Sequence, residues 1–109
     1  DDLLNWLPAR LTALLLAVTG CVLHLGKSIR KDAKLHRSPN AGWPETAMGY
    51  GLGLALAGPR SYEGQMQDFA WVNQGGSEPK ILDIKRAVRM LWSAWLIVLV
   101  LALSIAFWG

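Results

Sequence analysis

Residues 91–108, LWSAWLIVLVLALSIAFW, form an uncharged apolar run near the end of the chain. A transmembrane helix needs about 20 such residues. Trp92 and Trp95 lie at one end of the run and Trp108 at the other, which is typical of aromatic belts at membrane interfaces. The alternative is a helix buried in a soluble core, but a chain of 109 residues encloses too little to cover one. The run therefore predicts a transmembrane helix.

Residues 82–90, just before this run, predict a basic amphipathic foot that continues into the same helix. The segment carries Lys85, Arg86 and Arg89, and Asp83 is a suitable N-cap residue.

A second apolar run, LTALLLAVTGCVLHL, occupies residues 11–25 and is short for a membrane span. Trp6 and Leu7 extend it, with Arg10 reaching back to the interface, so we predict a second membrane segment over about 7–26. The alternative is an element buried among other helices of a larger protein. The chain opens on Asp1-Asp2 rather than Met, and we expect it to be the C-terminal part of a longer protein. The expected fold class is an all-α integral membrane protein.

Basic residues gather at both ends of the segment that joins the two runs, with Lys27, Arg30, Lys31 and Lys34 at one end and Lys80, Lys85, Arg86 and Arg89 at the other. Basic residues near membrane ends mark the cytoplasmic side, which predicts a cytoplasmic loop over 27–90. A second interpretation is that they bind anionic lipid headgroups, and it gives the same sidedness.

Inside this loop, residues 44–57, PETAMGYGLGLALA, predict a short glycine-rich helix. Pro44 suits the first helical position, and Gly58-Pro59 would end the helix. Gly49 and Gly53 have the spacing that lets helices approach closely.

Several functional classes are excluded or disfavoured. With one cysteine, Cys21, the chain forms no internal disulfide, and the simplest role for Cys21 is packing. Gly26-Lys27-Ser28 lacks the earlier glycine of a phosphate-binding loop. His24 and His36 are too few for a zinc site. No nucleic-acid module is present, because the basic residues flank membrane segments.

Two polar motifs carry candidate chemistry. In DDLLNWLPAR, Asp1, Asp2 and Asn5 offer oxygen ligands for Mg²⁺, with Arg10 near an anion. The alternative is a solvated helix flank. In RSPNAGWPE, residues 37–45, two prolines stiffen the entry to the following helix. Its first amides and Arg37 favour an anion, although a simple stiff turn fits the composition equally well.

These motifs, together with the stretch up to GPRSYEG, resemble the CobD/CbiB family, membrane proteins of cobalamin biosynthesis named adenosylcobinamide-phosphate synthase. The resemblance is specific from Asp1 to about Gly64, weakens over 65–77, and returns in the final membrane helix. It implies an ATP-dependent amide ligase that joins adenosylcobyric acid to (R)-1-aminopropan-2-ol or its O-phosphate. It also implies a multi-pass protein of the inner membrane, with ATP and Mg²⁺ as cofactors. The implied partners are membrane lipid, the corrinoid and amino-alcohol substrates, and further N-terminal membrane helices of the same protein.

The resemblance also implies site residues. The expected catalytic set is Asp1, Asp2, Asn5, Arg10, Arg37, Ser38, Asn40 and Glu45, with Asp1 and Asp2 also as Mg²⁺ ligands. The expected substrate-binding set is Gly42, Gly58, Arg60 and Tyr62.

The two motifs can share a site only if the segment 7–26 does not cross the membrane completely. If residues 7–26 cross the membrane, Asp1 and Arg37 lie on opposite faces, so either the first run inserts only partly or DDLLNWLPAR has a separate role. The alternative function is a non-catalytic membrane protein, either a regulator related to AmpE or a scaffold. An AmpE-like protein would not need RSPNAG or GPRSYEG, and this chain has both.

Overall fold

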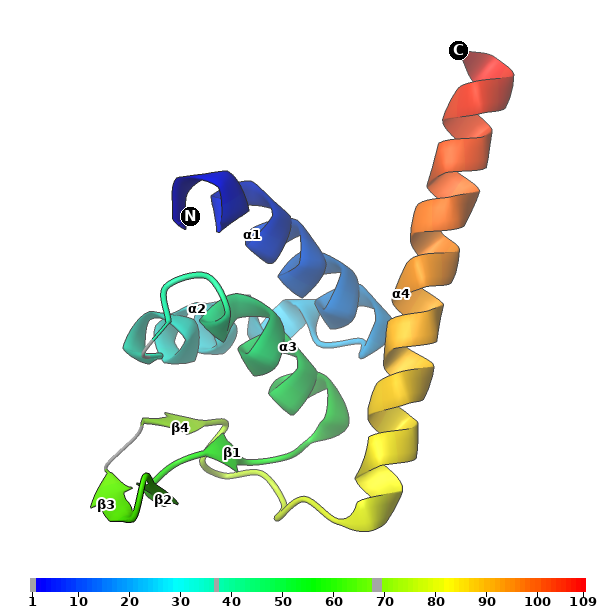
Figure 1. Cartoon of the computed structure of the whole chain (residues 1–109). Coiled ribbons are helices and arrows are strands. Elements are labelled where there is room, and N and C mark those ends of the chain that lie inside the picture. Colours follow the sequence, from blue (N-terminus) through cyan, green and yellow to red (C-terminus); the bar gives the residue numbers. More distant parts are fainter. Residues whose placement is uncertain (1, 37, 68–69) are drawn as a thin grey trace.

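The computed structural model describes residues 2–36, 38–67 and 70–109, which form four α-helices and a small amount of β-structure (Figure 1). Three helices, α1 (Asp2–Thr19), α2 (Gly26–Leu35) and α3 (Gly42–Leu52), pack together, with a 3-10 turn, η1 (Leu23–Leu25), between the first two. Two antiparallel pairs of short strands follow, and the chain ends in the long helix α4 (Ile81–Trp108).

Helix α4 contains the predicted basic foot and the apolar run in one continuous helix of 28 residues, and an 18-residue window within it has a mean hydropathy of 2.4. Its C-terminal half extends away from the other helices in Figure 1. Lys80, not Asp83, is the N-cap residue. The Asp83 carboxylate accepts a hydrogen bond from the Lys80 N–H at 2.8 Å, as the third residue of a helix does in a capping arrangement. The prediction placed the helix start about three residues too late.

Helix α1 begins earlier and ends earlier than the predicted membrane segment 7–26. Among the described residues, α4 is the one helix long and apolar enough to cross a membrane, and the apolar part of α1, Leu3–Thr19, is shorter. A second span is therefore not shown. The helix stops because Val22 donates to the carbonyl of Ala17 at 2.8 Å and Cys21 to that of Val18 at 3.1 Å, with Cys21 in the left-handed region at φ 58°. These bonds form a Schellman motif.

Cys21, expected to pack, is instead exposed at the turn that ends α1. After this turn the chain reverses through η1 and α2, whose basic residues are exposed.

Helix α3 occupies Gly42–Leu52 rather than 44–57. It ends in a second Schellman motif, in which Leu54 donates to the Gly49 carbonyl and Gly53, at φ 72°, donates to that of Tyr50. Residues 54–57, which the prediction placed in the helix, are not helical: Leu54 forms an isolated bridge with Ser77, and Leu56–Ala57 form strand β1. An apolar run of this length does not by itself distinguish helix from strand.

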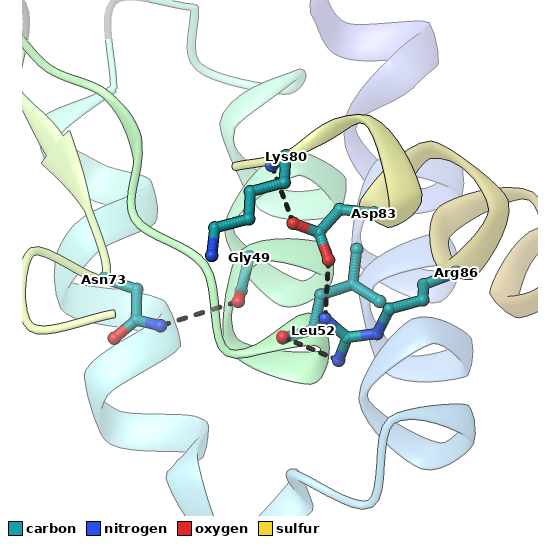
Figure 2. A network of polar contacts seen from close by, with 6 residues as sticks. All are labelled: Gly49, Leu52, Asn73, Lys80, Asp83 and Arg86. Atoms are coloured by element: carbon teal, nitrogen blue, oxygen red, sulfur yellow. Dashed lines mark hydrogen bonds and ion pairs between the residues drawn. The ribbon is translucent and has the colours of Figure 1, made fainter. Parts of the chain in front are cut away.

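Side chains from distant segments cover the C-terminal end of α3 (Figure 2). Arg86 donates to the Leu52 carbonyl at 2.9 Å and is itself held by Asp83 at 2.8 Å. The Asn73 amide donates to the carbonyls of Gly49 at 3.5 Å and Leu54 at 3.2 Å. The last carbonyls of α3 are thus paired with α4 and with the segment after β4.

The strands correct the all-α prediction, although helix predominates. Strand β1 (Leu56–Ala57) pairs with β4 (Trp71–Val72), and β2 (Arg60–Tyr62) pairs with β3 (Gln65–Gln67). The two-residue loop Glu63-Gly64 has positive φ at both positions, 54° and 80°, which is the type I′ turn that suits the twist of a hairpin. The predicted loop 27–90 is therefore structured over much of its length.

The core lies where α1, α2, α3 and the start of α4 meet, and it is built from buried residues including Leu16, Ile29, Ala47 and Met90. Gly20 and Gly51 bring two backbone segments of this core close together, because a Cβ at Gly20 would lie 2.6 Å from the Gly51 Cα. Close packing was predicted at Gly49 and Gly53. Gly49 is buried, and a Cβ there would lie 2.9 Å from Val72 Cγ1, whereas Gly53 is exposed at the helix end and Gly51 makes the contact with Gly20.

A polar contact fixes α2 against α3. The Asp32 carboxylate accepts a 2.6 Å hydrogen bond from the Tyr50 hydroxyl and a 2.9 Å bond from the Asn73 backbone N–H. Burial of the hydroxyl and its bond to Asp32 raise the pKa of Tyr50 to about 12.

Candidate functional site

The turn between α2 and α3 is held by local hydrogen bonds. The Ser38 N–H donates to Nδ1 of His36 at 3.0 Å, and the Ser38 carbonyl accepts from the Gly42 N–H at 3.3 Å. The Trp43 N–H donates to the Asn40 carbonyl at 3.1 Å. The stiff turn predicted from the two prolines is therefore a hydrogen-bonded turn that carries Ser38 and Asn40 at fixed positions.

A histidine and a glutamate join the two ends of this turn. Nε2 of His36 bonds to the Glu45 carboxylate, nine residues further on. Because Nδ1 accepts a bond from Ser38, the proton of a neutral ring lies on Nε2, which donates it to Glu45. The pair fits tightly over Gly42, where a Cβ would lie 2.5 Å from the His36 Cβ and 3.0 Å from the Ala33 carbonyl oxygen. Gly42 thus has a packing reason for lacking a side chain.

Arg10 connects α1 to this turn. Its guanidinium lies over the ring of Trp6, 4.2 Å from the centroid, and over that of Trp43, 4.8 Å from the centroid. One nitrogen donates to the Trp6 carbonyl at 2.9 Å and to the Asn40 side-chain oxygen at 3.4 Å. Contacts of a cation with aromatic faces hold the guanidinium plane in place. Arg10 therefore orients the amide of Asn40, thirty residues away in the sequence.

An open groove of about 360 Å³ lies between α1 and the turn. One wall comes from α1 and the other from the turn and the start of α3, and the lining residues are Asn5, Pro8, Ala9, Thr12, Ser38, Asn40, Ala41 and Pro44. Three predicted site residues from the two motifs, Asn5, Ser38 and Asn40, thus meet in one groove. This geometry removes the expected conflict between the motifs, because the chain reverses after α1 and α3 packs beside it (Figure 1).

The first amides of α3 do not serve as the anion site that the sequence suggested. The N–H groups of Gly42, Trp43 and Glu45 already donate to the carbonyls of the preceding turn, and Pro44 has none. The N–H groups at the start of α3 are therefore not available to an anion in the groove.

The other predicted residues are distributed as follows. Glu45 bonds to His36 and is not among the groove-lining residues. Gly58 lies under the Trp71 ring in the β1–β4 region, where a Cβ would come within 2.6 Å of that ring, and it has φ 78°. A role for Gly42 or Gly58 in substrate binding stays a prediction.

The structure does not describe the side chains of five predicted site residues. Asp1 and Arg37 lie outside the described residues. The backbones of Asp2, Arg60 and Tyr62 belong to α1 and β2, but their side chains lie outside the description. Within the described part of the chain, no group of three or more His, Cys, Asp or Glu side chains is arranged to hold a metal ion. The magnesium prediction therefore rests on Asp1 and Asp2.

Sequence reasoning missed His36, Trp6 and Trp43 as parts of the site. Trp6 precedes Arg10 by four residues, the spacing that places two side chains on one helix face, so this contact was available from the sequence. His36 and Trp43 depend on how the turn folds back, which no local pattern indicates.

Comparisons with known proteins bear on this arrangement. The model of the family described as CobD/Cbib protein matches residues 1–91. The chain is 45% identical over 101 residues to the cobalamin biosynthesis protein CobD of Brucella anthropi, covering 85% of this chain and 31% of the relative. It is 41% identical over 91 residues to CobD of Rhodobacter capsulatus, covering 83% of this chain and 29% of that protein.

A third relative, the cobalamin biosynthesis protein CbiB of Salmonella typhimurium, is 35% identical over 109 residues, covering 95% of this chain and 34% of the relative. The chain thus spans about a third of the length of the curated relatives that it matches. No solved structure matches it. Both motifs that line the groove fall within the matched residues, and the chain belongs to the CobD/CbiB family.

Proposed function

We propose that this chain supplies part of the active site of an enzyme of cobalamin biosynthesis. The proposed reaction joins a propionate carboxyl group of adenosylcobyric acid to the amine of (R)-1-aminopropan-2-ol, or of its O-phosphate, in an ATP-dependent amide ligation. Membership of the family and the names of its relatives support the pathway. The observation that carries the assignment of a site is the groove in which Asn5, Ser38 and Asn40 meet.

The groove suits the smaller of the two substrates. Its polar lining consists of neutral groups that can donate or accept hydrogen bonds, and the positive charge of Arg10 lies directly behind Asn40. Such a lining favours a hydroxyl or phosphate group. A volume of about 360 Å³ lies at the lower end of the range for ligand pockets, which is large enough for an amino alcohol phosphate but too small for a corrin ring. In our proposal the ring lies outside the groove and only the reacting side chain approaches it.

The side chains around the groove bind and position. Asn40 is held by Arg10, and Ser38 is held through its N–H by His36, which Glu45 fixes in turn. An amine and a carboxyl group placed side by side react far faster than the same groups free in solution. We therefore assign Asn40 and Ser38 to substrate contact, and Arg10, His36 and Glu45 to positioning.

ATP and Mg²⁺ remain part of the proposal through the family resemblance. ATP would supply the phosphoryl group that activates the carboxyl group. The described residues that line the groove include no carboxylate, so they fit a magnesium ion poorly. Asp1 and Asp2 are the residues that we propose to hold it. We also propose that the protein is a multi-pass protein of the inner membrane, with the segment 27–90 on the cytoplasmic side.

A product assay with the complete protein in detergent tests this proposal. Adenosylcobyric acid, the amino alcohol or its phosphate, and ATP are supplied, and the corrinoid amide is detected by mass spectrometry. We expect an ATP-dependent product. Absence of that product, under conditions in which a curated relative forms it, would sink the ligase assignment.

Variants separate the groove from a scaffold role. Asn40→Ala should raise the KM for the amino alcohol substrate by about tenfold or more, because a hydrogen bond to a charged group contributes roughly 1.5–3 kcal/mol. Ser38→Ala should also weaken binding. Ser104→Ala is the matched control, because Ser104 is exposed on α4 and, among the described residues, its hydroxyl bonds only to the Val100 carbonyl within its own helix. A scaffold protein would show the same behaviour for all three variants.

A further inference from the structure

A second hollow, of about 260 Å³, lies where α1, α3 and α4 meet. The ends of α1 and α3 form one side of it and α4 forms the other, and its lining residues are Thr19, Gly20, Gly51, Leu52, Arg86, Arg89, Met90 and Ser93. Gly20 and Gly51 contribute no side chains, so the hollow is open down to the backbone of two helices. None of these residues lines the groove described above.

The hollow is cationic. It is lined by two arginines and no acidic residue. Arg86 is already engaged, because it pairs with Asp83 and donates to the Leu52 carbonyl, which offsets the negative end of the α3 dipole. Arg89 is exposed, and within the described part of the chain its guanidinium has neither a hydrogen bond nor an ion pair. One guanidinium in the hollow is thus available for an anion.

The position of the hollow along α4 indicates which anion. The uncharged run begins at Leu91, two residues after Arg89, and its 18 residues rise about 27 Å, close to the roughly 30 Å of a bilayer core. Trp92 and Trp95, both exposed, mark the interfacial layer at that end. With α4 in a bilayer, Arg89 lies at the level of the lipid phosphates.

We propose that this hollow binds the phosphate headgroup of an anionic phospholipid, with Arg89 as the principal contact and Arg86 as the second cation. A guanidinium donates two parallel hydrogen bonds to a phosphate, which gives a geometric preference that a diffuse surface charge lacks. Basic hollows between helices at the membrane surface are a recurrent form of headgroup site. The proposal requires α4 to lie in a bilayer, and it does not depend on the proposed ligase reaction.

The helix offers a matched control for the test. Lys85 lies in the same basic foot and is exposed, but it does not line the hollow. Lys85→Gln and Arg89→Gln therefore remove one charge each, at positions one helical turn or about 6 Å apart along α4. Neither side chain has a hydrogen bond or ion pair in the described part of the chain, so both variants should have the same melting temperature as the wild type.

The complete protein, purified in a neutral detergent, is titrated with phosphatidylglycerol, phosphatidylcholine or inorganic phosphate, and bound lipid is counted by native mass spectrometry. We expect one phosphatidylglycerol to bind more tightly than phosphatidylcholine. Lys85→Gln should weaken it by at most about fivefold, the effect of one surface charge. Arg89→Gln should weaken it by about twentyfold or more, because charge-assisted hydrogen bonds are lost as well. Arg89→Lys keeps the positive charge but cannot donate two parallel hydrogen bonds, so its affinity for phosphatidylglycerol should lie between those of Arg89→Gln and the wild type.

Three results would overturn the proposal. Equal losses in Arg89→Gln and Lys85→Gln would show a diffuse surface effect. Because both lipids carry a phosphate and differ in net charge, equal binding of the two would show that the hollow does not prefer an anionic headgroup. Displacement of phosphatidylglycerol by inorganic phosphate at comparable concentration would identify a site for a soluble anion.

Discussion

Gly42→Ala tests whether the turn that carries the groove residues is held by close packing. Gly42 is the first residue of α3. An added Cβ would lie 2.5 Å from the His36 Cβ, 2.8 Å from its Cγ and 3.0 Å from the Ala33 carbonyl oxygen. Carbon atoms in good contact are roughly 3.5–4.0 Å apart, so His36 has to move by about 1 Å. His36 is bound on both sides, by Ser38 and Glu45, and cannot yield alone.

The expected cost follows from this geometry. Overpacking of a tight contact destabilises a protein by about 1–3 kcal/mol. Replacing glycine by alanine recovers up to about 0.5–1 kcal/mol in a helix interior, and less at a first position. We therefore expect Gly42→Ala to lower the free energy of unfolding by about 1–2 kcal/mol. Because the turn moves with His36, the KM for the amino alcohol substrate should rise as well.

Gly26→Ala is a control matched in position and chemistry. Gly26 is the first residue of α2, and an added Cβ there meets no atom within 4 Å. This variant should be as stable as the wild type or slightly more stable. Both unfolding free energies are measured by titration with a denaturing detergent in mixed micelles, followed by circular dichroism. If Gly42→Ala unfolds at the same point as Gly26→Ala, the close contact at His36 does not hold the turn and the reasoning fails.

Three further predictions concern the scaffold. The pKa of Tyr50 is raised to about 12 in the folded protein, above its ordinary value of 10.0, so the folded state holds the proton more tightly. The stabilisation that this pKa shift contributes is fully present below pH 10 and is lost as the pH rises from 10 to about 12. The free energy of unfolding, measured at pH 9 and pH 11.5, should show this loss in the wild type. Tyr50→Phe, which cannot donate a hydrogen bond to Asp32, should not show it. Arg86→Gln should lower the free energy of unfolding by about 1–3 kcal/mol, because it leaves the carbonyl of Leu52, the last residue of α3, unpaired. A free energy of unfolding equal to that of the wild type would show that water replaces the hydrogen bond. Cys21 and Gly53 both end a helix at positive φ, which glycine adopts with less strain than other residues. Cys21→Gly should therefore stabilise the protein and Gly53→Ala should destabilise it, each by about 1 kcal/mol. Melting temperatures that shift in the same direction in both variants would contradict this.

The long helix was predictable because its signals are local. An uncharged run flanked by tryptophans and a basic foot predict one helix without knowledge of the rest of the fold, and α4 confirms it. The residues of the groove were found through the family resemblance. Their meeting was not predictable, because it depends on the reversal after Thr19, where Cys21 rather than glycine adopts the left-handed conformation.

The end of α3 shows where prediction from the local sequence fails. Leu54 to Ala57 continue an apolar pattern that suits a helix, and Gly58-Pro59 is a strong stop signal. The helix nevertheless ends at Leu52, where Arg86 pairs with the Leu52 carbonyl and Asn73 with that of Gly49. Those two residues lie far along the chain, so the choice between the two stop signals is made by tertiary contacts.

The contact of Gly20 with Gly51 also has a mechanical consequence. It lies at the C-terminal end of α1, whereas the groove lies along the N-terminal part of that helix, so Gly20 is the pivot for any tilt of α1 that the Arg10 contacts with Asn40 and Trp43 accommodate. Asn5 is fifteen residues from the pivot, about 22 Å along the helix axis. A tilt of about 3° at the glycines therefore displaces Asn5 by roughly 1 Å, enough to admit or exclude a methyl group. Substitutions around the pivot can thus adjust the width of the groove without changing any residue that lines it.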